Sequence, residues 1–161
     1  MDGVIMDQVR LGVIGAGMQG ISHLRQFARH PLVELRAICD INDELLKSSA
    51  EIFGIPLQFT DYGELVAGDE VDAVVIVLPD HLHRDAAVRA LEAGKHVLLE
   101  KPMATNLDDA AAIEAAAANS DRCFMLNLSN RWMYAFSEGR KILDGGAYGE
   151  VRYLFARMMN R

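Results

Sequence analysis

The segment Gly15-Ala16-Gly17-Met18-Gln19-Gly20 constrains the fold of this chain more than any other stretch, because of what flanks it. The apolar run 9–14 before it predicts a buried strand, and residues 21–28 after it place apolar side chains at helical spacing. A G-x-G-x-x-G sequence between a strand and a helix is typical of a dinucleotide-binding turn. The sequence therefore predicts a strand–turn–helix unit that binds the pyrophosphate of a dinucleotide.

Each glycine of this segment has a separate task in such a unit. Gly15 permits the tight turn, Gly17 lets the pyrophosphate approach the backbone, and Gly20 lets the helix pack close to the strand. The first N–H groups of the helix, at Met18 and Gln19, are free to bind phosphate oxygens, which the helix dipole also favours. All five residues are therefore predicted to bind the cofactor.

An acidic residue follows the second apolar run, residues 32–39. Asp40 stands roughly 20 residues beyond the glycines, where a carboxylate accepts hydrogen bonds from the adenosine ribose. It would also repel a 2′-phosphate, and neither Ile41 nor Asn42 offers a positive charge in compensation. NAD is therefore predicted as the cofactor, with NADP less favoured. Asp40 could also cap the helix expected to begin near Asp43, and the two roles are compatible.

The composition is that of an ordinary globular chain of about one domain, with 161 residues, 51% hydrophobic and 24% charged. A net charge of −7 without a basic cluster argues against nucleic acid as a partner. No apolar run approaches the roughly 20 residues that span a bilayer, so no membrane association is expected. Residues 1–8 are short and acidic, which predicts a disordered lead-in rather than a signal peptide.

Two cysteines are too few for a disulfide framework. Cys39 and Cys123 each lie in an apolar, strand-like run, so both are expected to be buried structural thiols. A reducing cytoplasmic location fits this cysteine usage.

Strand-like and helix-like segments alternate along most of the chain. Beyond Asp40, the expected strands are 56–60, 71–78, 96–100 and 122–128; the expected helices are 44–53, 61–67, 83–93, 105–119 (capped by Thr105) and 131–143. Such alternation with short loops predicts an α/β fold, a Rossmann-type doubly wound parallel sheet, as an NAD(P)-binding domain over residues 9–145. Ligands of these sheets bind at the carboxyl ends of the strands.

Residues 146–161 are expected to start a second α/β domain that is otherwise missing. The run 150–159 predicts a strand rich in apolar side chains, among them Tyr153, Leu154 and Phe155. An exposed apolar strand edge can pair with another copy of the chain, so a homo-oligomer is expected.

The chain also resembles the N-terminal half of the glucose-fructose oxidoreductase/inositol dehydrogenase (Gfo/Idh/MocA) family, from about Val9 onward. Four features support the resemblance: Gly15 to Gly20 with Asp40; Pro79-Asp80-His81-Leu82-His83 followed by Gly94-Lys95-His96-Val97 and Glu100-Lys101-Pro102; Asn127 with Asn130-Arg131-Trp132; and Gly146-Ala147-Tyr148-Gly149-Glu150. The resemblance implies an NAD(P)-dependent oxidoreductase that acts on a sugar, a polyol or a similar hydroxylated small molecule.

The resemblance also implies roles for single residues. Lys101 takes the position of the family's lysine beside nicotinamide and substrate, where it would hydrogen-bond a reacting hydroxyl and help to deprotonate it. The alternative for Lys101 is a solvated loop lysine or an ion pair with Glu100. Pro102 is expected to be cis. The remaining cofactor contacts that the resemblance implies are Leu78, Pro79, His83, Glu100 and Asn127.

Several alternatives remain open. His83 could instead pack at a helix start, and Asn127 could instead hydrogen-bond its own loop. The pair His81 and His83 lacks a suitably spaced third ligand, so no metal is expected. The family's catalytic histidine belongs to the second domain, so the 161 residues alone are expected to be inactive. The chain could also be a non-catalytic dinucleotide-binding module; a methyltransferase is a third and weaker alternative.

Overall fold

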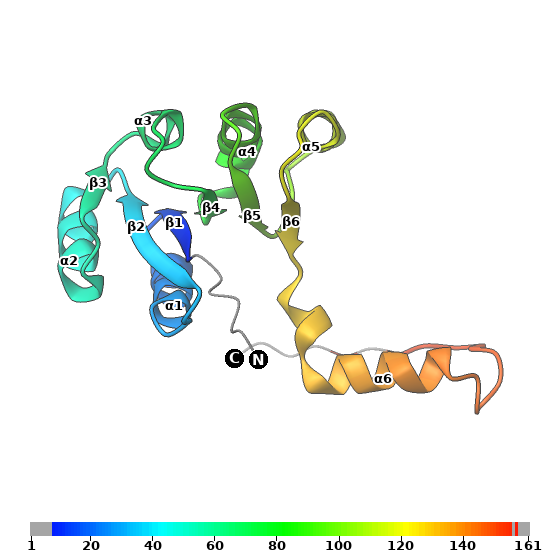
Figure 1. The fold of residues 1–161 in the computed structure, drawn as a ribbon. Coiled ribbons are helices and arrows are strands. Elements are labelled where there is room, and N and C mark those ends of the chain that lie inside the picture. The colour runs from blue at the N-terminus through cyan, green and yellow to red at the C-terminus, as the bar shows by residue number, and fades with distance from the viewer. Residues whose placement is uncertain (1–7, 156, 158–161) are drawn as a thin grey trace, which may run out of the picture. The chain divides into compact units, whose positions relative to one another are not determined.

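A computed structural model describes residues 8–155 and 157. Its core is one parallel sheet of six strands in the order β3-β2-β1-β4-β5-β6 (Figure 1). The strands are β1 (Val9–Ile14), β2 (Val33–Cys39), β3 (Leu57–Phe59), β4 (Ala73–Ile76), β5 (His96–Glu100) and β6 (Phe124–Asn127). The predicted Rossmann-type α/β fold is confirmed.

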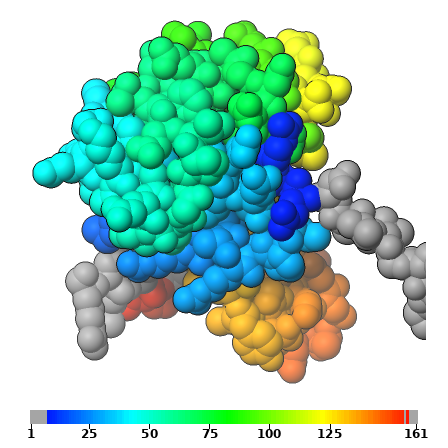
Figure 2. All heavy atoms as spheres, turned by 60° about the vertical axis from the view of Figure 1, so that its left-hand side comes forward, coloured from blue at the N-terminus to red at the C-terminus, as the bar shows by residue number. Residues whose placement is uncertain are grey.

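Helices cover both faces of the sheet (Figure 1). On one face lie α1 (Met18–Phe27) and α2 (Asp43–Phe53); on the other lie α3 (Tyr62–Ala67), α4 (His83–Glu92) and α5 (Leu107–Ala118). The short helix η1 (Asp80–Leu82) precedes α4. Figure 2 shows the residues of α2, β3 and α3, in cyan to green, forming a continuous surface over the β3 side of the sheet.

The sheet has two apolar cores because side chains alternate between its faces. Val74 and Ile76 of β4 pack with α3, α4 and α5, while Val75 between them packs with α1 and α2. All three side chains are almost fully buried. Strands buried on both faces are near-continuously apolar, which is why the run around β4 predicted a central strand.

Two helix starts differ from the prediction. Asn42 caps α2 by accepting hydrogen bonds from the N–H groups of Glu44 and Leu45, so Asp40 is not that cap. Asn106, not Thr105, caps α5 by accepting from Asp109 N. An asparagine side chain is as good an N-cap as threonine or aspartate, and both sites offered two candidates within two residues.

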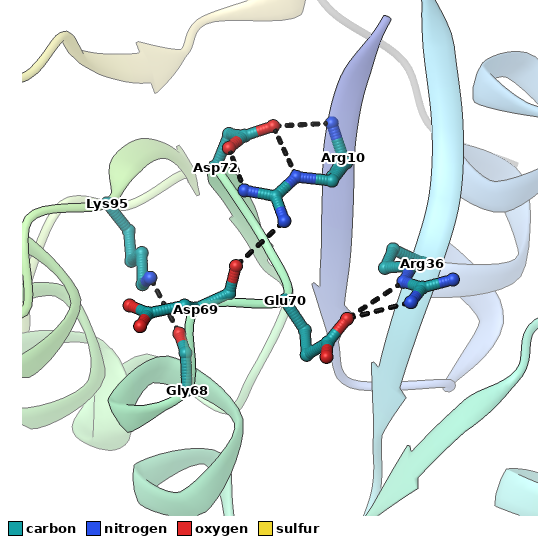
Figure 3. Close-up of polar contacts among 7 residues, drawn as sticks. All are labelled: Arg10, Arg36, Gly68, Asp69, Glu70, Asp72 and Lys95. Atoms are coloured by element: carbon teal, nitrogen blue, oxygen red, sulfur yellow. Dashed lines mark hydrogen bonds and ion pairs between the residues drawn. The ribbon is translucent and has the colours of Figure 1, made fainter.

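A network of charged and polar groups fastens the amino ends of the strands (Figure 3). The Arg10 guanidinium donates to both carboxylate oxygens of Asp72, at 2.5 and 3.1 Å, and to the Asp69 carbonyl at 2.8 Å. Arg36 pairs with Glu70 at 2.8 Å. Lys95 donates from Nζ to the Gly68 carbonyl at 2.7 Å. These contacts hold the connection between α3 and β4 at the edge of the sheet opposite the strands' carboxyl ends.

Tertiary contacts divide the chain into two units, with the boundary between Asn127 and Leu128. The second unit contains a short helix, η2 (Ser129–Trp132), and α6 (Tyr134–Asp144). The predicted strand over 150–159 is not formed in the residues described there, 150–155 and 157. A strand requires a hydrogen-bonding neighbour, and this segment has none among the described residues. Residues 1–7, predicted as a disordered lead-in, lie outside the described part.

Within the described residues, no helix is both long enough and apolar enough to cross a membrane.

Candidate dinucleotide-binding site

The site lies where the strand order reverses between β1 and β4. The glycine turn follows β1, and residues 77–79 follow β4, at the carboxyl end of the sheet. Two cavities of about 560 and 330 Å³ open beside this turn and share Gly17, Val77, Leu78 and Pro79 in their linings. Open α/β sheets bind ligands at such a switch point.

The three glycines stand in three different environments. Gly15 has φ +103°, and a Cβ added there would lie 2.3 Å from the Val77 carbonyl oxygen. A Cβ on Gly20 would lie 1.9 Å from the Gly15 carbonyl oxygen, so α1 can pack this close to the turn only if residue 20 has no side chain. A Cβ on Gly17 would meet no atom within 4 Å. Gly15 and Gly20 therefore serve the fold, while Gly17 leaves open space at the junction of the two cavities.

The N-terminus of α1 faces this open space. Gly17 is the N-cap residue and has no side chain to satisfy the first N–H groups of the helix, at Met18 and Gln19. The first turn of α1 contains no acidic residue. Both features favour an anion, and Gly17, Met18, Gln19 and Gly20 all line the smaller cavity. A pyrophosphate therefore fits the residues present.

Asp40 lies at the larger cavity and is anchored by two backbone groups. Its Oδ2 accepts from Ala16 N at 2.6 Å, and its Oδ1 accepts from Asn42 N at 2.8 Å. An ionised carboxylate has about four acceptor positions, so it can accept ribose hydroxyls as well. The larger cavity also contains Ile41, Thr60, Asp61, Tyr62, Leu82 and Arg89.

A hydrogen-bonded group forms one wall of the larger cavity. The Tyr62 hydroxyl donates to Asp85 Oδ2 at 2.7 Å, and Arg89 Nε lies 2.8 Å from the same oxygen. Burial and the Asp85 carboxylate raise the pKa of Tyr62 to about 12, so the phenol stays protonated. The positive charge of Arg89 is already paired within this wall.

The smaller cavity contains Lys101 and Glu100. The Lys101 side chain is exposed, and its backbone N donates to Glu100 Oε2 at 3.0 Å. The peptide bond between Lys101 and Pro102 is cis, as predicted. Among the described residues, the Lys101 side chain forms no ion pair with Glu100. The Lys101 ammonium therefore lies exposed at the cavity, and the alternative of an ion pair with Glu100 is not observed.

Glu100 is the centre of a network that joins α1, β5 and β6. Its Oε1 accepts from Asn127 Nδ2 at 2.6 Å and lies 2.8 Å from His23 Nε2. Burial alone would raise the pKa of Glu100, but hydrogen bonds from His23, Asn127 and the Lys101 N–H outweigh it and lower the pKa. The Glu100 carboxylate is therefore ionised at neutral pH.

His83 does not reach the cavities. The residue is 1% exposed, with Nδ1 2.7 Å from the Pro102 carbonyl oxygen and Nε2 2.9 Å from the Leu78 carbonyl oxygen. The prediction that His83 contacts the cofactor does not fit this placement, because both ring nitrogens already face backbone oxygens. Its position favours the packing role at the start of α4, which ties the loops after β4 and β5 together.

The two cysteines differ from each other. Cys39 is buried, as expected, and burial raises the pKa of its thiol to about 12. Cys123 is exposed, so the prediction that it is buried is wrong. β6 begins only at Phe124, one residue after Cys123, and the cysteine lies in the preceding turn. Within the described residues, no group of three His, Cys, Asp or Glu side chains could hold a metal ion.

Sequence reasoning missed several residues at the site. One of them is His23, whose Nε2 lies 2.8 Å from Glu100 Oε1. The usable signal is its position three residues after Gly20, on the face of α1 that meets the strands. Thr60, Asp61 and Tyr62 line the larger cavity because they follow the carboxyl end of β3.

The fold and the site together define a dinucleotide-binding Rossmann domain. The family model "Oxidoreductase family, NAD-binding Rossmann fold" (GFO_IDH_MocA) matches residues 9–128. The chain therefore belongs to the Gfo/Idh/MocA oxidoreductase family, and its N-terminal unit is an NAD(P)-binding domain.

Three relatives illustrate the similarity. Inositol 2-dehydrogenase of Salmonella typhimurium is 32% identical over 155 residues, which cover 94% of this chain and 46% of that protein. The structure of scyllo-inositol dehydrogenase from Lactobacillus casei with NAD(H) and scyllo-inositol has a TM-score of 0.87 at 25% identity, covering 89% of this chain and 43% of that one. A mutant 3-ketoreductase from Actinomadura kijaniata with TDP-benzene and NADP has a TM-score of 0.81 at 34% identity, covering 91% and 45%. The chain thus spans less than half the length of these relatives.

Proposed function

We propose that this chain binds NAD across the two cavities and supplies the cofactor-binding part of an oxidoreductase for hydroxylated small molecules. The observation that supports this most is the open space at Gly17, at the N-terminus of α1 and between the two cavities. A pyrophosphate held there directs one half of the dinucleotide into each cavity. The adenosine half belongs in the larger cavity, where Asp40 lies, and the nicotinamide half belongs in the smaller one, beside Lys101.

The charges of the larger cavity favour NAD over NADP. The Asp40 carboxylate lies where the ribose hydroxyls would bind, and it would repel a 2′-phosphate. Arg89 is the basic residue of that cavity, and Asp85 already pairs with it at 2.8 Å. Relatives of this fold bind either cofactor, so this preference is a property that we infer from Asp40 and its surroundings.

Lys101 is the residue that we propose for the reaction itself. The bound nicotinamide cofactor supplies the hydride acceptor or donor. The free Lys101 ammonium at the smaller cavity can hydrogen-bond a substrate hydroxyl and take part in moving its proton. Glu100 positions Lys101 by accepting its backbone N–H. The names of the two inositol dehydrogenases point to polyols as the class of substrate.

Calorimetric titration of the chain with NADH tests the proposal. We expect saturable binding by the wild-type chain and by Lys101→Ala, because the phosphate contacts and the larger cavity do not involve this side chain. Gly17→Val is expected to weaken NADH binding at least about tenfold while the thermal melt is retained. Absence of NADH binding by a folded wild-type chain would contradict the proposal.

Turnover separates an oxidoreductase from a binding module. A full-length protein containing this domain is expected to form NADH from NAD⁺ and a polyol such as an inositol, and its Lys101→Ala variant is expected to lose that activity while still binding NADH. Cofactor binding without turnover on any of a panel of polyols and sugars would favour the non-catalytic module.

A further inference from the structure

We propose that Glu100 makes this site discriminate between the two redox states of its cofactor, favouring the oxidised form through the negative charge that it holds at the nicotinamide cavity. This inference rests on the proposed function, which assigns the nicotinamide half to the smaller cavity. NAD⁺ carries a positive charge on its nicotinamide ring, whereas the ring of NADH is neutral. A fixed carboxylate at that cavity therefore binds the two forms unequally.

The carboxylate of Glu100 is held in place by three donors. Its Oε1 faces His23 Nε2 at 2.8 Å and Asn127 Nδ2 at 2.6 Å, and its Oε2 accepts from Lys101 N at 3.0 Å. His23 is held in turn by stacking on Phe27, with ring centroids 6.0 Å apart and planes 15° from parallel. Three donors, from α1, from the loop after β5 and from β6, thus stabilise the ionised form and prevent the carboxylate from turning away.

The charge of Glu100 is less screened than those of its neighbours. Its side chain is only 12% exposed, and that of His23 is 13% exposed. Two other charged residues line the same cavity, Asp80 and Lys101, and both are exposed. Water screens exposed charges strongly, so they change the local potential less than a shielded carboxylate does. Glu100 is therefore the group expected to set the potential at this end of the site.

The net charge around Glu100 also depends on the groups that donate to it. A neutral imidazole at His23 donates its Nε2 hydrogen and leaves the pair with one negative charge; an imidazolium would leave it neutral. The measurement is therefore made at about pH 8, where imidazoles are generally neutral. Asn127 adds no charge of its own.

The test is the ratio of two dissociation constants, that for NAD⁺ divided by that for NADH, measured by calorimetry. Glu100→Gln keeps the size of the side chain and two acceptor positions but removes the charge. In this variant the ratio is expected to rise about tenfold, because one unit charge within about 10 Å has an effect of this order at an effective dielectric constant of about 20. Glu100→Asp keeps the charge and disturbs the packing, and is expected to stay within about threefold of the wild type. Asp80→Asn removes a charge from the exposed rim of the same cavity and serves as the matched control, with a change of less than about twofold.

The outcomes separate the two proposals. If a folded wild-type chain binds neither NAD⁺ nor NADH, the proposed function fails. If both bind and Glu100→Gln leaves the ratio unchanged, or Glu100→Asp shifts it equally, the inference about Glu100 is wrong. If Glu100→Gln does not melt cooperatively, His23→Lys is the second variant, because it places a permanent positive charge against the same carboxylate and position 23 does not line the cavity. His23→Lys is expected to raise the ratio as well. An unchanged ratio in His23→Lys would overturn the inference.

Discussion

The Asp40 carboxylate accepts a hydrogen bond from the backbone N–H of Ala16, with 2.6 Å between Oδ2 and N. This contact joins the end of β2 to the middle of the glycine turn after β1. The residue that is proposed to bind the ribose therefore also fixes the loop that is proposed to bind the pyrophosphate. The two halves of the fingerprint, Gly15 to Gly20 and Asp40, form one hydrogen-bonded unit rather than two independent signals.

Gly17→Val is expected to weaken NADH binding at least about tenfold, with little change in stability. Its backbone is in an ordinary extended conformation, φ −64° and ψ −174°, and no atom lies within 4 Å of an added Cβ. The valine side chain would thus fill the space proposed for the pyrophosphate without disturbing the fold. A loss of more than about 1 kcal/mol in the free energy of unfolding would contradict the claim that this space is open in the folded protein.

Gly15→Ala is expected to do the opposite, lowering the free energy of unfolding by about 2–4 kcal/mol. The new Cβ would meet a backbone oxygen at 2.3 Å in a backbone conformation, φ +103°, that alanine rarely adopts. Urea denaturation of the two glycine variants side by side compares these effects. Equal stability of Gly15→Ala and the wild type would show that the turn differs from the one described.

His83→Phe is expected to cost about 1–3 kcal/mol of stability, because phenylalanine cannot donate the ring hydrogen bond that His83 makes to the Leu78 or the Pro102 carbonyl oxygen. His81→Phe, at an exposed position two residues earlier, is the control and is expected to change stability by less than about 0.5 kcal/mol. Chemical denaturation measures both. A tolerated phenylalanine at 83 would mean that the ring packs as an apolar group and does not hold the two loops.

Lys95→Met is expected to cost about 1–3 kcal/mol of stability. Lys95 is 6% exposed, and its Nζ donates to the Gly68 carbonyl at 2.7 Å, so methionine keeps the packing of the stem but leaves that oxygen unpaired. Lys47→Met provides the comparison, since the Lys47 side chain is 68% exposed and pairs with Asp43 one turn away. A stability loss at position 47 as large as that at 95 would remove the argument from burial.

Acid destabilisation is expected to depend in part on Asp72. The hydrogen bond from the Arg10 guanidinium lowers the pKa of Asp72, against a smaller opposing effect of burial. A lowered pKa in the folded state means that the stabilisation is present above the unfolded-state pKa, about 3.9, and is lost as the pH falls through the folded-state pKa. Denaturation midpoints of Asp72→Asn between about pH 5 and 2 should therefore fall less steeply than those of the wild type.

Asp121→Asn is the control for this pH series, because the Asp121 side chain is 85% exposed. It should keep the wild-type slope. Identical slopes for wild type and Asp72→Asn would contradict the assignment of the acid response to the pair of Arg10 and Asp72.

The sequence predicts the fold well where the pattern is local. The apolar runs for β1 and β4 and the glycine turn between strand and helix each fix both an element and its burial, and the structure confirms them. Element ends are harder, because adjacent residues compete for one role. Thr105 and Asn106 are both good caps, and only the backbone of the loop decides between them.

The polar contacts of the site were predictable only in part. Gly17 and Asp40 could be predicted from their spacing, since each follows the end of a predicted strand at a characteristic number of residues. The contact of His23 with Glu100 spans three elements and depends on how α1 lies against the sheet, which no local pattern specifies. The placement of His83 was unpredictable for a related reason: its position after β4 is near the site, but its side chain is buried and lines neither cavity.

The central claim is that Asp40 and the glycine turn form an NAD site, and calorimetric titration of the wild-type chain and Asp40→Ala with NADH and then NADPH tests it most directly. We predict that the wild type binds NADH more tightly than NADPH. Asp40→Ala is expected to weaken NADH binding at least about tenfold and to narrow or reverse the preference for NADH, because the ribose acceptor and the repulsion of the 2′-phosphate are lost together. Tighter binding of NADPH by the wild type, or an unchanged preference in Asp40→Ala, would contradict it.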